Sequence, residues 1–121
     1  MFNIFGRKKK KFRLASYEIR PLAPGKGGCI ATDMITVDGL KVALMYREQP
    51  DNDVDSGWRF LSGRESQSYL DEPSHSEVYD VNTIANYDPD VIPFLDAPIG
   101  SAFERTGGAG DFVEAESPPN E

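Results

Sequence analysis

The sequence predicts a small single α+β domain in which an antiparallel sheet is combined with a few short helices. A chain of 121 residues has the length of one domain. Strand-like segments come first and are joined by short turns, and helix-like segments follow, which is the order expected of an α+β protein. The composition, 39% hydrophobic and 27% charged, is that of a globular protein and excludes collagen-like, disulfide-rich and fully disordered chains.

The first half of the domain has the pattern of a sheet. Residues 29–37 are rich in β-branched side chains and predict a strand. Asp38-Gly39 follows, and this pair favours a two-residue hairpin turn because both residues tolerate a positive φ. Residues 40–47 then predict the returning strand, and residues 58–61 predict another short strand. Trp58 and Cys29 are expected in the core.

Short helices are expected in the second half. Residues 65–72 suit a helix that Pro73 ends, and residues 82–86 suit a helical turn. Asp90 is a candidate N-cap of a further helix, with Pro93 in the first turn, where a missing N–H group costs little. The remaining segments are an acidic loop over 48–57, an apolar segment over 78–81 whose pattern does not decide between helix and strand, and a final strand over 98–105.

The two ends of the chain are expected to lie outside the folded domain, which we place at residues 14–106. Residues 1–13 form a basic flexible arm, and residues 107–121 form a flexible acidic tail rich in Gly, Pro and Glu. Neither end has a pattern that would bury one face, so the fold should need neither, although Phe112-Val113 could dock.

Charge is distributed unevenly along the chain. The net charge is −7, from 13 basic and 20 acidic residues, yet residues 1–13 hold six basic residues and no acidic one. The remaining 7 basic and 20 acidic residues give the body a net charge of −13. Such a body repels nucleic acid and attracts basic protein surfaces. The arm, with Phe2, Ile4 and Phe5 beside its cations, could make at most a weak contact with a membrane surface; the alternative is a solvated leader.

Several classes of chemistry lack the residues they need. Cys29 is the only cysteine, which excludes an internal disulfide and favours a reducing, cytoplasmic compartment. No apolar stretch suits a secretory signal or a membrane span. His75 is the only histidine, so the chain has few side chains that could bind zinc, and a serine hydrolase would have to use this one histidine. Residues 51–57 miss the calcium-loop pattern, because the glycine comes one place late and Ser62 stands where a glutamate is needed. We expect no metal, cofactor or catalysis.

Four ordered blocks of the sequence resemble a known bacterial family. They are GWRFLSG over 57–63, Glu65 with Tyr69-Leu70-Asp71, VYDVNTIANYDPD over 78–90, and APIGSAFER over 97–105. The family was long described as a domain of unknown function and was later assigned by genome context to the immunity proteins of polymorphic toxin systems. The resemblance covers residues 28–105. It implies a protein partner, a toxin domain that is bound and neutralised by surface complementarity, and it supplies no catalytic residues.

The acidic loops are the candidate partner site. Loops on a rigid scaffold commonly carry binding, and a basic toxin would associate faster with an acidic surface. We expect the loops at 50–57 and 86–96 to form one acidic rim, with Tyr87 as an aromatic anchor. Its carboxylates are those of Asp51, Asp53, Asp55, Asp88, Asp90 and Asp96. The alternatives are a solvated acidic face that keeps the protein in solution, and an accessory interaction domain held at a membrane surface by residues 1–13.

Overall fold

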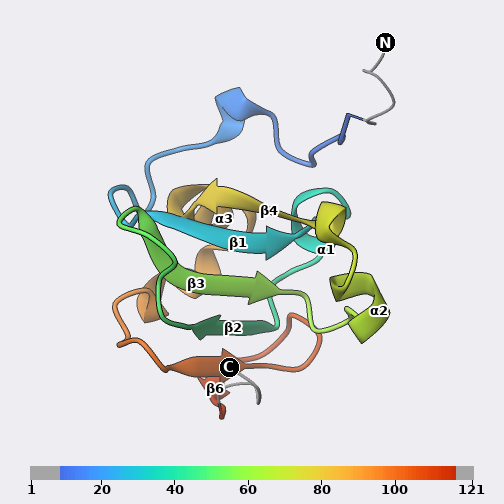
Figure 1. Cartoon of the computed structure of the whole chain (residues 1–121). Helices are drawn as coiled ribbons and strands as arrows, with labels where there is room; N and C mark the ends of the chain where they lie inside the picture. Colours follow the sequence, from blue (N-terminus) through green and yellow to red (C-terminus); the bar gives the residue numbers. More distant parts are fainter. Residues whose placement is uncertain (1–8, 117–121) are drawn as a thin grey trace.

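A mixed sheet of six strands forms the centre of the structure, a computed structural model that describes residues 9–116 (Figure 1). The strand order is β4-β1-β3-β2-β5-β6. The strands are β1 Gly28–Thr32, β2 Leu44–Arg47, β3 Asp55–Leu61, β4 Ser76–Asp80, β5 Ala102–Glu104 and β6 Val113–Glu114. With short helices packed around this sheet, the fold is α+β, as the sequence predicted.

The helices are all short. Three are α-helices, α1 Asp33–Thr36, α2 Gln67–Leu70 and α3 Val81–Tyr87, and three are 3-10 helices, η1 Ser16–Glu18, η2 Pro73–His75 and η3 Pro89–Phe94. Asp80 caps α3 by accepting a hydrogen bond from Asn82 N (2.8 Å), which confirms a helical turn near 82–86. Within residues 9–116, no helix has the length and apolar character that crossing a membrane requires.

The predicted hairpin at Asp38-Gly39 is wrong. The first strand ends at Thr32 and α1 follows at once, so Asp38-Gly39 ends a helix instead of joining two strands. Gly39 has a φ of 79° and its N–H donates to Ile35 O (3.1 Å). A positive φ terminates a helix as readily as it turns a hairpin, so the dipeptide alone did not distinguish the two.

The change in connectivity also changes the sheet. Instead of a neighbouring returning strand, β1 pairs in parallel with β3 and antiparallel with β4, so the sheet is mixed and not purely antiparallel. β2 covers only the second part of 40–47 and lies between β3 and β5. The segment at 78–81, whose secondary structure the sequence did not decide, is mostly β4, an edge strand of the sheet.

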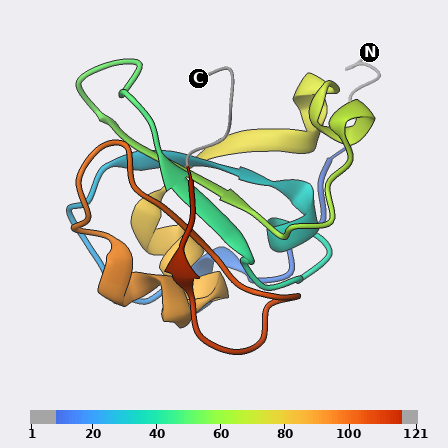
Figure 2. The same ribbon diagram turned by 90° about the horizontal axis from the view of Figure 1, so that it is seen from below.

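One face of the sheet packs on α3 and η3, which lie behind the sheet in Figure 1 and below it in Figure 2. Trp58 and Phe60 point to this covered face and are at most 1% exposed, and Trp58 Nε1 donates to Leu95 O (3.1 Å). Cys29 is buried on the same side, and burial raises the pKa of its thiol far above the usual range. Core positions for Trp58 and Cys29 are confirmed.

The N-cap of η3 is Asp88 and not Asp90, the residue that the sequence predicted. Asp88 caps η3 by accepting a hydrogen bond from Asp90 N (3.1 Å), and Pro89 takes the first helical position. Pro93 therefore lies inside the helix instead of in its first turn. A 3-10 helix tolerates this more easily than a long α-helix, because the element has few internal hydrogen bonds to lose.

The described parts of the arm and of the tail both contact the domain. In this respect the structure differs from the free arm and tail that the sequence predicted. Lys10 Nζ binds the carboxylates of Asp33 (2.9 Å) and Glu77 (2.7 Å). Phe112 is 9% exposed in the core, and the next two residues form β6 beside β5. Residues 1–8 and 117–121 of the predicted arm and tail lie outside the described part of the chain.

Candidate functional site

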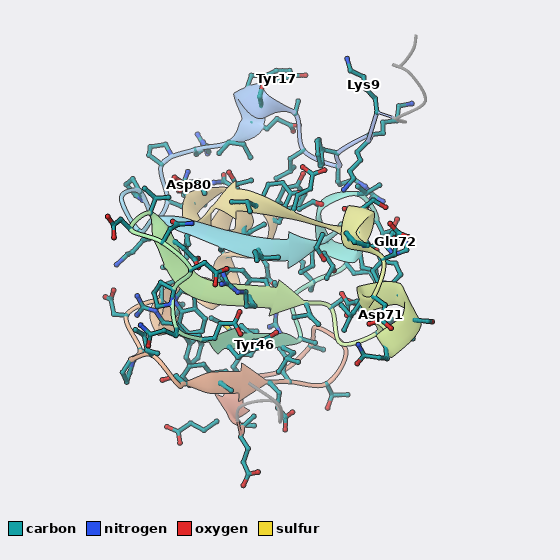
Figure 3. The ribbon with its side chains drawn as sticks, viewed as in Figure 1. Lys9, Tyr17, Tyr46, Asp71, Glu72 and Asp80 are labelled. Atoms are coloured by element: carbon teal, nitrogen blue, oxygen red, sulfur yellow. The ribbon has the colours of Figure 1, made fainter. Side chains whose placement is uncertain are left out.

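The second face of the sheet is the candidate site. Among residues 9–116, no helix covers it, and it faces the viewer in Figures 1 and 3. The side chains that the strand pairings place on it include Ile30, Leu44, Tyr46, Arg59, Leu61 and Val78, and we call this set the open face. Val78 is 74% exposed, and the other apolar members are half-buried. A face of this kind is a surface on which a second molecule could pack.

Two segments rise beside the open face. The loop over 48–54 stands at one end of it, and the α2–η2 segment stands at the other end (Figure 2). Gly57 fixes the first loop against the sheet, since its φ is 92° and a side chain there would collide with Glu48 O. At the second end, Glu65 accepts hydrogen bonds from Thr32 Oγ1 and from Ser62 N (2.9 Å). The first end is thus positioned by the close approach of Gly57 to Glu48, and the second end by internal hydrogen bonds.

Arg59 lies on the open face but is covered by three carboxylates. Its guanidinium makes two hydrogen bonds to Asp55, at 2.8 and 3.0 Å, and one to Glu48 Oε2 at 2.7 Å. Asp51 lies 3.6 Å from the same guanidinium. The Arg59 side chain is only 4% exposed. One positive and three negative charges leave this cluster with a net charge of −2.

Asp55 and Arg59 stabilise the charged form of each other. Hydrogen bonds from Arg59 hold the pKa of Asp55 well below its usual range, and burial opposes this only in part. Burial lowers the pKa of Arg59, but its hydrogen bonds to Asp55 and Glu48 outweigh that effect and raise it. Asp55 and Arg59 therefore stay charged as a pair at physiological pH.

A pocket of about 370 Å³ lies beside this cluster, and we call it the acidic pocket. It is lined by Tyr46, Arg47, Glu48, Gln49, Asp51, Ile99 and Gly100. The guanidinium of Arg47 is engaged elsewhere: it donates to Ser56 O (2.8 Å) and Ala97 O (2.7 Å) and lies over the Trp58 ring. Tyr46 belongs both to the pocket and to the open face, so the two are continuous (Figure 3).

Four of the predicted site residues lie at this end of the sheet. Asp51 and Asp53 precede β3, and Asp55 is its first residue. Asp96 lies at the same end, because its carboxylate binds Lys26 Nζ (2.6 Å) just before β1, and β1 and β3 begin side by side. Hydrogen bonding to Lys26 lowers the pKa of Asp96.

The other two carboxylates lie elsewhere. Asp88 is 1% exposed, accepts hydrogen bonds from Val42 N (2.9 Å) and forms an ion pair with Arg105 (2.7 Å). Asp90 binds the same guanidinium at 2.8 Å. Val42 precedes β2, which begins where β3 ends, so Asp88 and Asp90 lie at the opposite end of the sheet from Asp55. The two loops do not form one rim.

Tyr87 is not placed as an exposed anchor. Its ring is half-buried against the core, and its hydroxyl accepts a hydrogen bond from Leu14 N (3.1 Å). The residues that sequence reasoning missed are Arg59, Tyr46 and Val78. A signal existed for Arg59: it alternates with Trp58 and Phe60, and a core position for those two puts Arg59 on the opposite face.

The polar groups of the calcium-like loop and of His75 contact other residues of the same chain. In the calcium-like loop, Asn52 Oδ1 accepts from Val54 N and Asp55 N, both at 3.0 Å, and Asp55 holds Arg59. The His75 ring stacks on Tyr69 with centroids 4.0 Å apart. Residues 9–116 contain no group of three or more His, Cys, Asp or Glu side chains placed to hold a metal ion.

Comparison with known proteins identifies the family. The family model described as the immunity protein Imm33 domain matches residues 29–116, which is most of the chain and contains the open face and the acidic pocket. No curated protein and no solved structure gives a significant match. The resemblance found in the sequence is confirmed, and the chain belongs to the Imm33 immunity protein family.

Proposed function

We propose that this protein binds a toxin domain through its open face and neutralises it without catalysis. The observation that carries the proposal is a sheet face that combines exposed and half-buried apolar side chains with an excess of carboxylates at one end. Family membership supports a toxin as the partner. We place the encounter in the cytoplasm, where a free thiol such as that of Cys29 stays reduced.

The chemistry of the face favours a basic partner. Protein interfaces commonly combine apolar contacts with polar and charged groups, and the open face offers both. Val78 offers the most exposed apolar contact, and Asp51, with its side chain 74% exposed, offers a charge at the edge. Opposite charge on the toxin would speed association and make it depend on salt. Of the six carboxylates expected to bind a partner, we retain Asp51, Asp53 and Asp96. Asp55 and Asp88 are bound to buried arginines, and Asp90 lies beside Asp88 at the opposite end of the sheet.

The test is co-expression with candidate toxin domains taken from the genes that neighbour this one. The wild-type protein should restore growth, and the purified pair should form a 1:1 complex by calorimetry. Because neutralisation by binding is stoichiometric, toxin activity should fall linearly until the two proteins are equimolar. Complete neutralisation by a small fraction of an equivalent would instead indicate catalysis, and a lack of both rescue and complex formation would refute the proposed function.

The alternative function, an accessory domain held at a membrane by residues 1–13, has less structural support. Lys10 is turned toward Asp33 and Glu77, and although burial lowers its pKa, hydrogen bonds to the two carboxylates raise it. This ammonium is therefore already neutralised within the domain. Sedimentation with vesicles rich in anionic lipid checks the alternative: binding that is lost when residues 1–9 are removed would favour it.

A further inference from the structure

We propose that the acidic pocket receives a lysine or arginine side chain of the toxin. This inference rests on the proposed function and specifies the contact at one end of the open face. The pocket volume, about 370 Å³, lies at the small end of the range of ligand sites, which suits one side chain better than a large ligand.

The walls of the pocket suit the stem of a long cationic side chain. Tyr46 and Ile99 supply its apolar parts, and Ile99 is 49% exposed. Lysine and arginine bury their methylene groups along apolar surface and keep the charged end near polar partners. A cation entering from the toxin would lay its stem between these two residues and bring its charged end to Glu48 and Asp51.

The carboxylates at the pocket are in excess of the cations that could neutralise them. Arg59 is already matched by its two hydrogen bonds to Asp55. Glu48 shares the same arginine, and Asp51 is held only at 3.6 Å, beyond hydrogen-bond distance. Arg47 does not fill the gap, because its guanidinium is bound to backbone carbonyl groups on the covered side of the sheet. A second cation would pair with the carboxylates of Glu48 and Asp51 that Arg59 does not fully neutralise.

Other occupants fit less well. An anion would face Glu48 and Asp51, and an apolar side chain would desolvate both carboxylates without pairing them. A guanidinium or an ammonium group is attracted by the two carboxylates and pairs with them. Charge-assisted hydrogen bonds to carboxylates are among the stronger contacts at interfaces. The occupant is therefore a basic side chain of the partner.

The first test uses small probes and needs no toxin. The ¹⁵N-labelled protein is titrated with N-acetylarginine amide, N-acetyllysine amide and the neutral isostere N-acetylcitrulline amide. We expect saturable shifts of the Glu48, Gln49 and Gly100 amides with both cationic probes and at least tenfold weaker binding of the citrulline compound. Asp51→Asn should weaken the cationic probes severalfold, whereas Asp38→Asn, an equal charge change at an exposed site beyond α1, should not.

The outcomes separate this inference from the proposed function. Equal binding of the citrulline probe, equal effects of the two variants, or shifts away from the pocket would overturn the pocket assignment. If the toxin is neutralised but its affinity is the same for Asp51→Asn and Asp38→Asn, only the pocket assignment is wrong. If the cationic probes bind but no toxin is neutralised, the pocket stands and the proposed function fails. Concentration-dependent dimerisation abolished by Asp51→Asn would show that the pocket holds a second copy of the chain instead.

Discussion

Replacing Asp88 by asparagine should destabilise the domain far more than the same change at Asp90. Both carboxylates bind Arg105, at 2.7 and 2.8 Å, so chemistry and distance are matched. Burial differs: the Asp88 side chain is 1% exposed and that of Asp90 is 64% exposed. Asp88 also accepts hydrogen bonds from Val42 N and Asp90 N. Its loss removes the buried one of the two charges that compensate the Arg105 guanidinium.

The magnitudes follow from burial. Removing one partner of a buried ion pair costs about 3–5 kcal/mol when the other charge is left alone. In Asp88→Asn the guanidinium of Arg105 keeps Asp90 as a partner, so we expect a loss at the lower end, about 3 kcal/mol. An exposed pair contributes about 1 kcal/mol or less. At about 4 °C per kcal/mol for a domain of this size, Asp88→Asn should lower the Tm by about 12 °C, and Asp90→Asn by no more than about 4 °C.

Urea unfolding followed by tryptophan fluorescence measures both variants, since Trp58 is the only tryptophan and is buried. Equal losses of stability in the two variants would refute the argument that burial decides the energy of this pair. An Asp88→Asn variant with normal stability and weaker toxin binding would restore Asp88 to the partner site that the sequence predicted.

Three further predictions concern the tail, the acidic cluster and the thiol. Phe112→Ala should cost about 3 kcal/mol in urea unfolding, because the ring is 9% exposed and contacts Phe94; a loss below about 1 kcal/mol would show that the segment after residue 106 is dispensable. Since Arg59 depresses the pKa of Asp55, that carboxylate stabilises the fold above its unfolded pKa of about 3.9, and this contribution is lost as pH falls through the lower folded value. The stability difference between wild type and Asp55→Asn should therefore shrink below about pH 4, and a constant difference from pH 7 to pH 2 would contradict the assignment. Burial raises the pKa of Cys29, so a thiol reagent at pH 8 should modify it orders of magnitude more slowly in the native protein than in denaturant; comparable rates would place the thiol at the surface.

The sequence predicted the fold class and much of the core because those depend on local patterns. The pattern around Trp58 indicated a strand with a buried side, and residues 82–86 suited a helical turn. The pairing of strands was not predictable in the same way. Asp38-Gly39 satisfies the backbone requirement of a hairpin and of a helix end equally, and only long-range contacts of β1 with β3 and β4 decide between them.

The candidate site was predicted only in part, for a related reason. Sequence distance suggested that acidic loops gather at one place, but carboxylates serve two purposes in this molecule. Asp88 is drawn into the interior by Arg105, a residue 17 positions away, whereas Asp51 stays at the surface. Composition does not distinguish a buried structural carboxylate from an exposed one. The open face itself depends on which sheet face α3 and η3 cover, which is a tertiary property.

Two arginine variants test most directly whether the open face is the toxin-binding surface. The measurement is their affinity for the toxin domain that the co-expression experiment identifies. Val78 is 74% exposed on the open face, and Tyr17 is 89% exposed on η1, away from that face (Figure 3). Val78→Arg should weaken binding by about 30-fold or more, as expected for a contact of at least about 2 kcal/mol, while Tyr17→Arg binds like the wild type. Both variants should keep the wild-type circular dichroism spectrum and Tm. Unchanged affinity for Val78→Arg together with weakened binding of Tyr17→Arg would place the interface on another side of the molecule.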